Sequence, residues 1–274
     1  MGRGGGPGPN GDVADVPYVL PRHPAEIDRL DVQHYALQEA LGANYLAPIQ
    51  RPALILDAGA GTGQWAFDLC EEFPDATVIG LDVVPSKPRP VDNYRFIRGN
   101  LLQGLPFSSA RFDFVHQRLL FGGIPVKSWS TVVADLVRVT RPGGWVELVE
   151  AATRPERAGP ATDRLAGMLE RLSRASGIDS TGIIYRSLDG YLLRAGVTGV
   201  TRHAVELPVG EWGGKVGSLM ASDGRALFTR LAGIFQARFG IPMHECLDLI
   251  VTAQQEWEQH HTTYGVVVAF GRKR

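Results

Sequence analysis

Residues 55–65 read ILDAGAGTGQW, an apolar run that passes through three glycines into a helical pattern. Because glycine has no Cβ, Gly59, Gly61 and Gly63 indicate backbone that turns sharply or that a ligand approaches closely. A strand, a glycine-rich turn and a helix N-terminus are typical of a ligand site at the carboxyl edge of a parallel sheet, where backbone amides and the helix dipole are available. Several nucleotide cofactors bind in this way.

The rest of the chain alternates between strand and helix patterns. Apolar or β-branched runs predict strands, and apolar residues three and four positions apart predict helices. The predicted strands are 52–59, 77–82, 94–100, 112–117, 144–150, 200–210 and 262–272, and the predicted helices are 24–41, 63–73, 130–140, 161–176, 188–196, 227–235 and 246–257. This order predicts an α/β fold with a doubly wound, Rossmann-like, mostly parallel sheet.

The charge and cysteine content restrict the partners of the protein. The 28 Lys and Arg residues balance 29 Asp and Glu residues, so the net charge of −1 provides no basic field for nucleic acid. Two cysteines are too few for a disulfide framework or a four-cysteine zinc site, and the histidines at 203, 244, 260 and 261 lack the spacing of metal ligands. We expect no nucleic-acid partner, no metal and a reducing, cytoplasmic setting.

The first residues, MGRGGGPGPNGD, lack the apolar core of a signal peptide, and no stretch reaches the roughly 18 apolar residues of a membrane span. We therefore expect a soluble protein with no membrane partner. The glycine- and proline-rich composition predicts a disordered tail over 1–16. A helical lid over 17–50 and a main domain over 51–274 are expected to follow, with cap helices around 155–187 and 212–261.

Two common nucleotide-binding motifs fit the glycine turn poorly. A dinucleotide site uses G-x-G-x-x-G, but Gln64 stands where the third glycine would fall. A P-loop requires Gly-Lys-Ser or Gly-Lys-Thr, and neither follows. Asp57 comes just before the glycines, where its charge would repel a pyrophosphate and would suit a ligand that carries an ammonium group.

Polar residues at the ends of the next two predicted strands identify the rest of such a ligand. Asp82 ends the strand 77–82, and a carboxylate there can accept hydrogen bonds from both hydroxyls of a ribose. Asn100 follows the third strand, where its side-chain oxygen could accept from an adenine amine while the Leu101 amide donates to a ring nitrogen. Ammonium, ribose and adenine in that order describe S-adenosylmethionine.

Four segments resemble the motifs of class I S-adenosylmethionine-dependent methyltransferases. They are DAGAGTG at 57–63, LD at 81–82, GNLLQGLPF at 99–107 and VTRPGGWVEL at 139–148. EIDRLDVQHYAL at 26–37, together with FDFVHQR and PGGWVELVE, is similar to the LaeA-type and trans-aconitate-methyltransferase-like group. The resemblance implies a seven-stranded sheet with a reversed last strand.

The resemblance also implies roles for individual residues. Near the ribose and adenine it places Asp82, Val83, Asn100 and Leu101, although many relatives carry Asp where this chain has Asn100. It places Gly59, Gly61 and Gly63 against the cofactor. It also implies that Asp57 acts mainly on the methionine end and that the Gln117 backbone carbonyl accepts from the ammonium group.

Methyl transfer from a sulfonium depends mainly on alignment of the acceptor with the methyl carbon, and a general base is needed only for poorly reactive acceptors. His116, near the end of the fourth predicted strand, is the candidate base, with a histidine packed in the sheet as the alternative. His34 in the first helix is either catalytic or a packed, hydrogen-bonded residue. Tyr18 either closes over the site or is an exposed tail aromatic. Arg118 either binds an acidic substrate or pairs with a local carboxylate.

Together these features predict a methyltransferase that acts on a small organic molecule, such as a specialised metabolite. The alternative is a LaeA-like regulatory protein that binds the cofactor and acts through a protein partner. Nucleic-acid methylation is disfavoured, because the fourth strand ends in HQRL rather than an N-P-P-Y type of sequence. The apolar helices after residue 155 form either a substrate cap or an interface between two copies of the chain, in which case the protein is a homodimer.

Overall fold

The structure, a computed structural model, describes residues 24–85 and 89–274, with the backbone alone for 24–27. The predictions for the tail over 1–16 and for Tyr18 lie outside the described residues. The described chain contains one seven-stranded sheet in the order β3-β2-β1-β4-β5-β7-β6. The strands are β1 Leu54–Ala58, β2 Thr77–Asp82, β3 Tyr94–Arg98, β4 Phe112–Arg118, β5 Thr140–Ala151, β6 Val197–Pro208 and β7 Thr263–Lys273.

The strand directions confirm the predicted mostly parallel sheet with a reversed last strand. β1 to β5 pair in parallel, and β7 runs antiparallel to both of its neighbours, β5 and β6. The carboxyl ends of β1, β2 and β4 therefore meet at one edge of the sheet. The glycine turn follows β1 at this edge.

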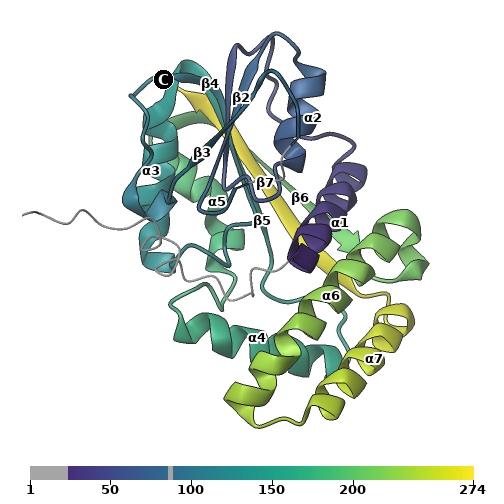
Figure 1. Ribbon diagram of the computed structural model, residues 1–274. Coiled ribbons are helices and arrows are strands. Elements are labelled where there is room, and N and C mark those ends of the chain that lie inside the picture. Colours follow the sequence, from purple (N-terminus) through teal and green to yellow (C-terminus); the bar gives the residue numbers. More distant parts are fainter. Residues whose placement is uncertain (1–23, 86–88) are drawn as a thin grey trace, which may run out of the picture.

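Helices lie on both faces of the sheet and beyond its carboxyl edge (Figure 1). The α-helices are α1 Pro24–Leu41, α2 Gln64–Glu72, α3 Trp129–Val139, α4 Pro160–Ala175, α5 Ile183–Arg194, α6 Gly214–Phe239 and α7 Met243–Gln259. Short 3-10 turns occur at η1 Leu101–Gln103, η2 Val126–Ser128 and η3 Glu211–Gly213. α3 and α5 pack on one face, and α2 packs on the other. We call α1, α4, α6 and α7, which pack around a second apolar cluster, the cap.

Several element boundaries differ from the predictions for local reasons. α5 begins at Ile183 rather than 188, because a short helical piece precedes a kink at Ser187 (φ −121°) and joins the predicted helix. α6 extends over Gly214–Phe239 rather than 227–235, since packing against α1 and α7 stabilises a first half that contains few apolar residues. β5 begins at Thr140 because that residue pairs with Phe112 of β4.

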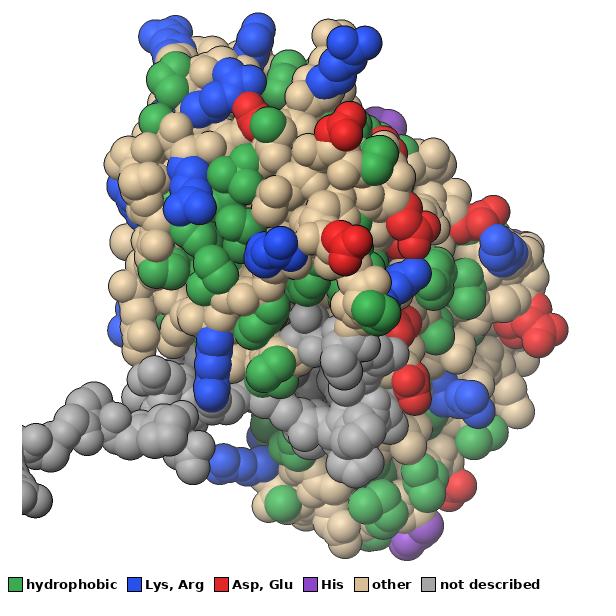
Figure 2. Space-filling model, turned by 45° about the horizontal axis from the view of Figure 1, so that its top comes forward, with side chains coloured by type: hydrophobic (Ala, Val, Ile, Leu, Met, Phe, Trp, Pro, Cys, Tyr) green, Lys and Arg blue, Asp and Glu red, His purple; other side chains and the backbone are tan. Residues whose placement is uncertain are grey.

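Figure 2 shows acidic and basic side chains on the same face of the molecule, in keeping with the balanced net charge. Over residues 24–85 and 89–274, no helix is both long and apolar enough to cross a membrane. Within the same ranges, no group of three or more His, Cys, Asp and Glu side chains could hold a metal ion.

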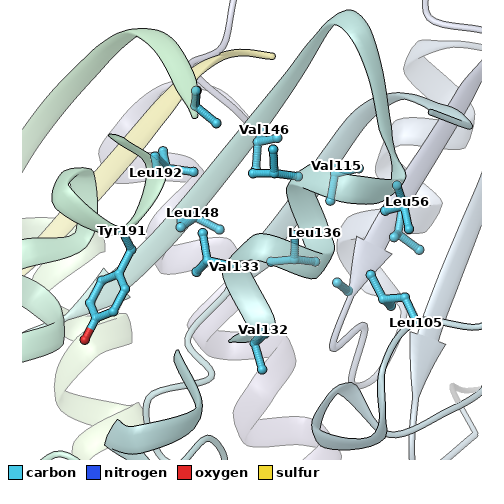
Figure 3. Packing of buried hydrophobic residues seen from close by; sticks show 14 of the residues in the cluster. Leu56, Leu105, Val115, Val132, Val133, Leu136, Val146, Leu148, Tyr191 and Leu192 are labelled. Carbon is cyan, nitrogen blue, oxygen red and sulfur yellow. The ribbon is translucent and has the colours of Figure 1, made fainter. Parts of the chain in front are cut away.

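The main core lies between the sheet and the α3–α5 layer (Figure 3). Leu56 of β1, Val115 of β4 and Leu148 of β5 project from the sheet, and Leu136 of α3 packs in the same cluster. All four side chains have no exposed surface. Burial of this apolar area stabilises the sheet beneath the glycine turn.

Replacement of Leu136 by alanine should lower the free energy of unfolding by roughly 2–5 kcal/mol, because it leaves a cavity in a close-packed core. Urea denaturation followed by circular dichroism measures the change. Leu193→Ala is the matched control in α5, since the Leu193 side chain is 56% exposed and its loss should cost less than about 0.5 kcal/mol. Equal losses in the two variants would contradict the described packing of α3.

Candidate functional site

The glycine turn after β1 has a backbone conformation that favours glycine. Gly59, Gly61 and Gly63 have φ values of +81°, +55° and +84°, a region that L side chains adopt only with strain. A Cβ on Gly59 would lie only 2.5 Å from the Leu120 Cδ1 atom of the loop after β4. The turn therefore brings bare backbone to the carboxyl edge of the sheet.

The end of β2 holds this turn in place. The Gly59 and Ala60 amides both donate to the carbonyl oxygen of Leu81, over 2.8 and 3.1 Å. The Gly61 amide donates to Asp82 Oδ2 over 2.9 Å, and the Val84 amide donates to Asp82 Oδ1 over 3.1 Å. Burial raises the pKa of the Asp82 carboxyl.

Asp82 fits the predicted ribose contact. A carboxylate offers about four acceptor positions, and the amides of Gly61, Val83 and Val84 use up to three of them. The residue as a whole is partly exposed, and a remaining acceptor position would serve a ligand beside the glycine turn. Val83 follows it, and the Val83 carbonyl accepts a hydrogen bond from Arg98 Nε over 3.1 Å. The ribose role of Asp82 and Val83 remains a prediction.

Asn100 has a local role that the sequence reasoning missed. Its side-chain oxygen accepts a hydrogen bond from the Leu102 amide over 2.9 Å, which caps the 3-10 turn η1 that begins at Leu101. An amide oxygen has a second lone pair, so the cap leaves one acceptor position for an adenine amine. The adenine contacts of Asn100 and Leu101 remain predictions.

His116 lies inside the layer between the sheet and α2. It aligns with Asp57 on β1 and with Glu147 on β5. The His116 Nδ1 atom is 3.5 Å from Asp57 Oδ1, and Nε2 is 4.0 Å from Glu147 Oε1. The ring stacks on Trp65 at 3.9 Å and has no exposed surface, and burial lowers its pKa. This placement favours the packed histidine over the base.

Glu147 anchors the segment that follows α1. Its Oε2 atom accepts hydrogen bonds from the Leu46 and Ala47 amides over 2.8 and 2.7 Å. The side chain is 1% exposed, and burial raises the pKa of its carboxyl to about 7. Glu147 is not among the residues predicted from the sequence. The available signal is an acidic residue inside the apolar strand pattern GWVELVE at 144–150.

Gln117 and Glu150 form a pair on the opposite face of the sheet. Gln117 Nε2 donates to Glu150 Oε1 over 2.5 Å, and Glu150 also accepts from the Leu120 and Phe121 amides over 2.8 and 3.2 Å. Glu150, which the sequence reasoning also missed, therefore fixes the loop that reaches Gly59. Burial raises the pKa of its carboxyl to about 8. The ammonium contact predicted for the Gln117 carbonyl remains a prediction.

His34 connects α1 to α2 and β4. Arg118 Nη2 lies 3.0 Å from His34 Nδ1, and His34 Nε2 lies 2.9 Å from Asp68 Oδ2. Because a guanidinium only donates, Nδ1 accepts and Nε2 carries the proton that is donated to Asp68. The His34 side chain is 1% exposed, so the structure favours the packed, hydrogen-bonded alternative for this residue as well.

Comparisons with known proteins agree with this architecture. Residues 55–144 match a family model described as a methyltransferase domain. The chain is 31% identical over 206 residues to methyltransferase str3 of Strobilurus tenacellus, with 72% of each chain covered. It is also 31% identical over 205 residues to the secondary metabolism regulator laeA of Monascus pilosus, covering 71% of this chain but 55% of the regulator.

A solved structure shares the fold at much lower sequence identity. Phosphoethanolamine N-methyltransferase 2 of Haemonchus contortus, in complex with phosphomonomethylethanolamine and S-adenosylhomocysteine, superposes with a TM-score of 0.52 and 12% identity. The superposition covers 89% of this chain and 58% of that protein.

Glu147→Gln should change how stability depends on pH. The raised pKa means that the folded protein holds a proton that the unfolded chain releases, so the stabilisation is full below about pH 4.5 and is lost as the pH rises through about 7. The stability of the wild type relative to the variant should therefore fall between pH 5 and pH 8, by up to about 3 kcal/mol. Urea denaturation at each pH measures this difference.

Glu206→Gln is the matched control, because it removes a glutamate from an exposed position on β6. The wild type and this control should keep a constant stability difference across the pH range. A constant difference for Glu147→Gln too would contradict the buried, protonated state of that side chain.

Proposed function

The chain belongs to the S-adenosylmethionine-dependent methyltransferases, and on that premise we propose that it methylates a small organic molecule of specialised metabolism. The bound cofactor supplies an electrophilic methyl group on its sulfonium. The residues of this chain contribute the cofactor site at the carboxyl edge of the sheet and the enclosure of the acceptor. The first contribution is proposed from the family's cofactor site, and the second from the described cap.

The arrangement of the cap is the observation that carries the small-molecule proposal. Leu30 of α1 lies 3.7 Å from the position that a Cβ on Gly61 would take. α1 is joined to α6 by an ion pair of 2.6 Å between Arg29 and Asp223, both of which are buried. Gln33 also donates to Asp223 over 3.2 Å. A long polymer needs an open groove, whereas helices joined across the carboxyl edge enclose a compact acceptor. The similarity to the methyltransferases str3 and pytC supports methyl transfer as the reaction.

The chemistry proposed for this site depends on alignment rather than on a histidine base. His116 and His34, the two candidate bases within the described residues, both have internal partners. Alignment of an acceptor with a reactive methyl group can supply much of the barrier reduction. The glycine turn and the cap would hold the two reactants in that geometry.

A regulatory role is the second candidate, because the chain is similar to laeA regulators over some 205 residues. Such a protein would keep the cofactor site and act through a protein partner. The cofactor site is therefore common to both proposals, and only turnover distinguishes them.

Asp82→Ala should weaken the binding of S-adenosylhomocysteine by roughly 10- to 100-fold, because it removes a charged acceptor beside the ribose and releases the Gly61 amide. Isothermal titration calorimetry measures the affinity, with NAD as the comparison ligand. Asp92→Ala, at an exposed position between β2 and β3, is the matched control and should bind like the wild type. Preferential binding of NAD would contradict the cofactor assignment.

The wild type should form S-adenosylhomocysteine when it is incubated with S-adenosylmethionine and a panel of small hydroxyl, amine and carbon acceptors. Product formation is measured by liquid chromatography and mass spectrometry, and Asp82→Ala should lower it. Cofactor binding without turnover on any acceptor would favour the regulatory candidate instead.

A further inference from the structure

Arg118 ends β4 at the carboxyl edge of the sheet, close to the glycine turn. Burial lowers the pKa of its guanidinium, and the residue as a whole is only partly exposed. Within residues 24–85 and 89–274, its guanidinium has no carboxylate oxygen within 4.0 Å. A desolvated cation without a paired anion is costly, so this position calls for an anionic ligand.

The carboxylates around Arg118 act on it only from a distance. Asp57, Asp68 and Glu147 each favour the charged guanidinium electrostatically. Each of them has closer hydrogen-bond partners of its own: His116 for Asp57, His34 for Asp68, and the Leu46 and Ala47 amides for Glu147. The acidic surroundings therefore stabilise the charge without occupying the donors of the guanidinium.

Among the residues that the structure describes, His34 is the one hydrogen-bond partner of the guanidinium. Of its five N–H donors, one reaches His34 Nδ1 over 3.0 Å. Asp68 fixes the His34 ring, and Gln38 and Gln64 in turn donate to Asp68 over 3.1 and 2.8 Å. A guanidinium fixed in this way can offer two parallel N–H groups to a carboxylate, which is the geometry that arginine binds best.

The location matches the amino-acid end of the cofactor. Leu30, one helical turn before His34 on α1, lies 3.7 Å from the position that a Cβ on Gly61 would take. Four residues of helix span about 6 Å, so Arg118 at His34 lies close to the glycine turn. The ammonium and the carboxylate of an amino acid share one carbon and must be bound side by side. Arg118 directly follows Gln117, whose carbonyl is the predicted ammonium partner.

We propose that Arg118 binds the carboxylate of the methionine part of the cofactor, and that His34 and Asp68 are positioning residues that orient its guanidinium. This assignment differs from both roles that the sequence leaves open for Arg118, which are an acidic substrate and a local carboxylate. It also gives a role to the buried His34, which lies between Asp68 and Arg118.

The test compares two ligands that differ in the carboxylate alone. S-adenosylhomocysteine and its decarboxylated analogue are titrated calorimetrically into the wild type, Arg118→Met and Arg118→Lys. Arg118→Met should weaken the binding of S-adenosylhomocysteine by roughly 10- to 100-fold. Arg118→Lys should weaken it less, since lysine keeps the positive charge but lacks the two parallel N–H donors of the guanidinium. Neither substitution should change the affinity of the decarboxylated analogue.

Two further variants separate positioning from folding. Arg111→Met, at an exposed position just before β4 begins, removes the same charge at the opposite edge and should leave both affinities unchanged. His34→Leu should produce a smaller loss that is still selective for S-adenosylhomocysteine. Thermal unfolding shows whether each variant folds. If Arg118→Met does not fold, the affinities of the two ligands are compared between Arg118→Lys and the wild type.

Equal weakening of both ligands would overturn the proposal, because it would indicate a purely structural role for Arg118. Unchanged binding of both ligands would overturn it too, and would leave Arg118 to bind an acidic acceptor. Failure of the wild type to bind S-adenosylhomocysteine would contradict the cofactor assignment itself, and the proposal with it.

Discussion

The attachment of the glycine turn to the end of β2 is the interaction on which the rest of the site depends. Three glycines with positive φ values make the turn, and hydrogen bonds to the Leu81 carbonyl and the Asp82 carboxylate hold it against the neighbouring strand. A single carboxylate therefore shapes the turn and also offers acceptors to a ligand. The parallel direction of β1 and β2 makes this possible, because it brings both strand ends to one edge.

Two glutamates of β5 likewise hold neighbouring loops by accepting hydrogen bonds from backbone amides. Glu147 and Glu150 are three residues apart, so their side chains project to opposite faces of the strand. Glu147 accepts two amides from the segment after α1, and Glu150 accepts two from the loop after β4. Each buried carboxyl thus replaces water as the partner of loop amides that border the site. Burial raises the pKa of both groups, which is the electrostatic cost of this arrangement.

α1 connects the sheet to the other helices of the cap. Its His34 contacts Asp68 and Arg118 on the sheet side, and its Arg29 pairs with Asp223 of the cap. Both connections are polar and largely buried, so they are directional as well as stabilising. α1, which precedes the first strand of the sheet in the sequence, therefore borders the predicted cofactor site.

The α/β fold and the cofactor class could be predicted from the sequence, because they depend on local patterns. Alternation of strands and helices, the three glycines and the position of Asp82 each depend on a few consecutive residues. The chain direction of the last strand came from family resemblance and is confirmed by the pairing of β7.

The direction of each side chain at the ends of the strands was decided only by the tertiary structure. A strand alternates its side chains between two faces, and an irregularity between Phe112 and Phe114 shifts the register of β4 against β5. Sequence spacing could therefore place His116 at the edge of the sheet but could not show that it stacks on Trp65. Glu147, Glu150 and the contact between His34 and Arg118 join segments 30 or more residues apart, and such contacts exist only once the chain has folded.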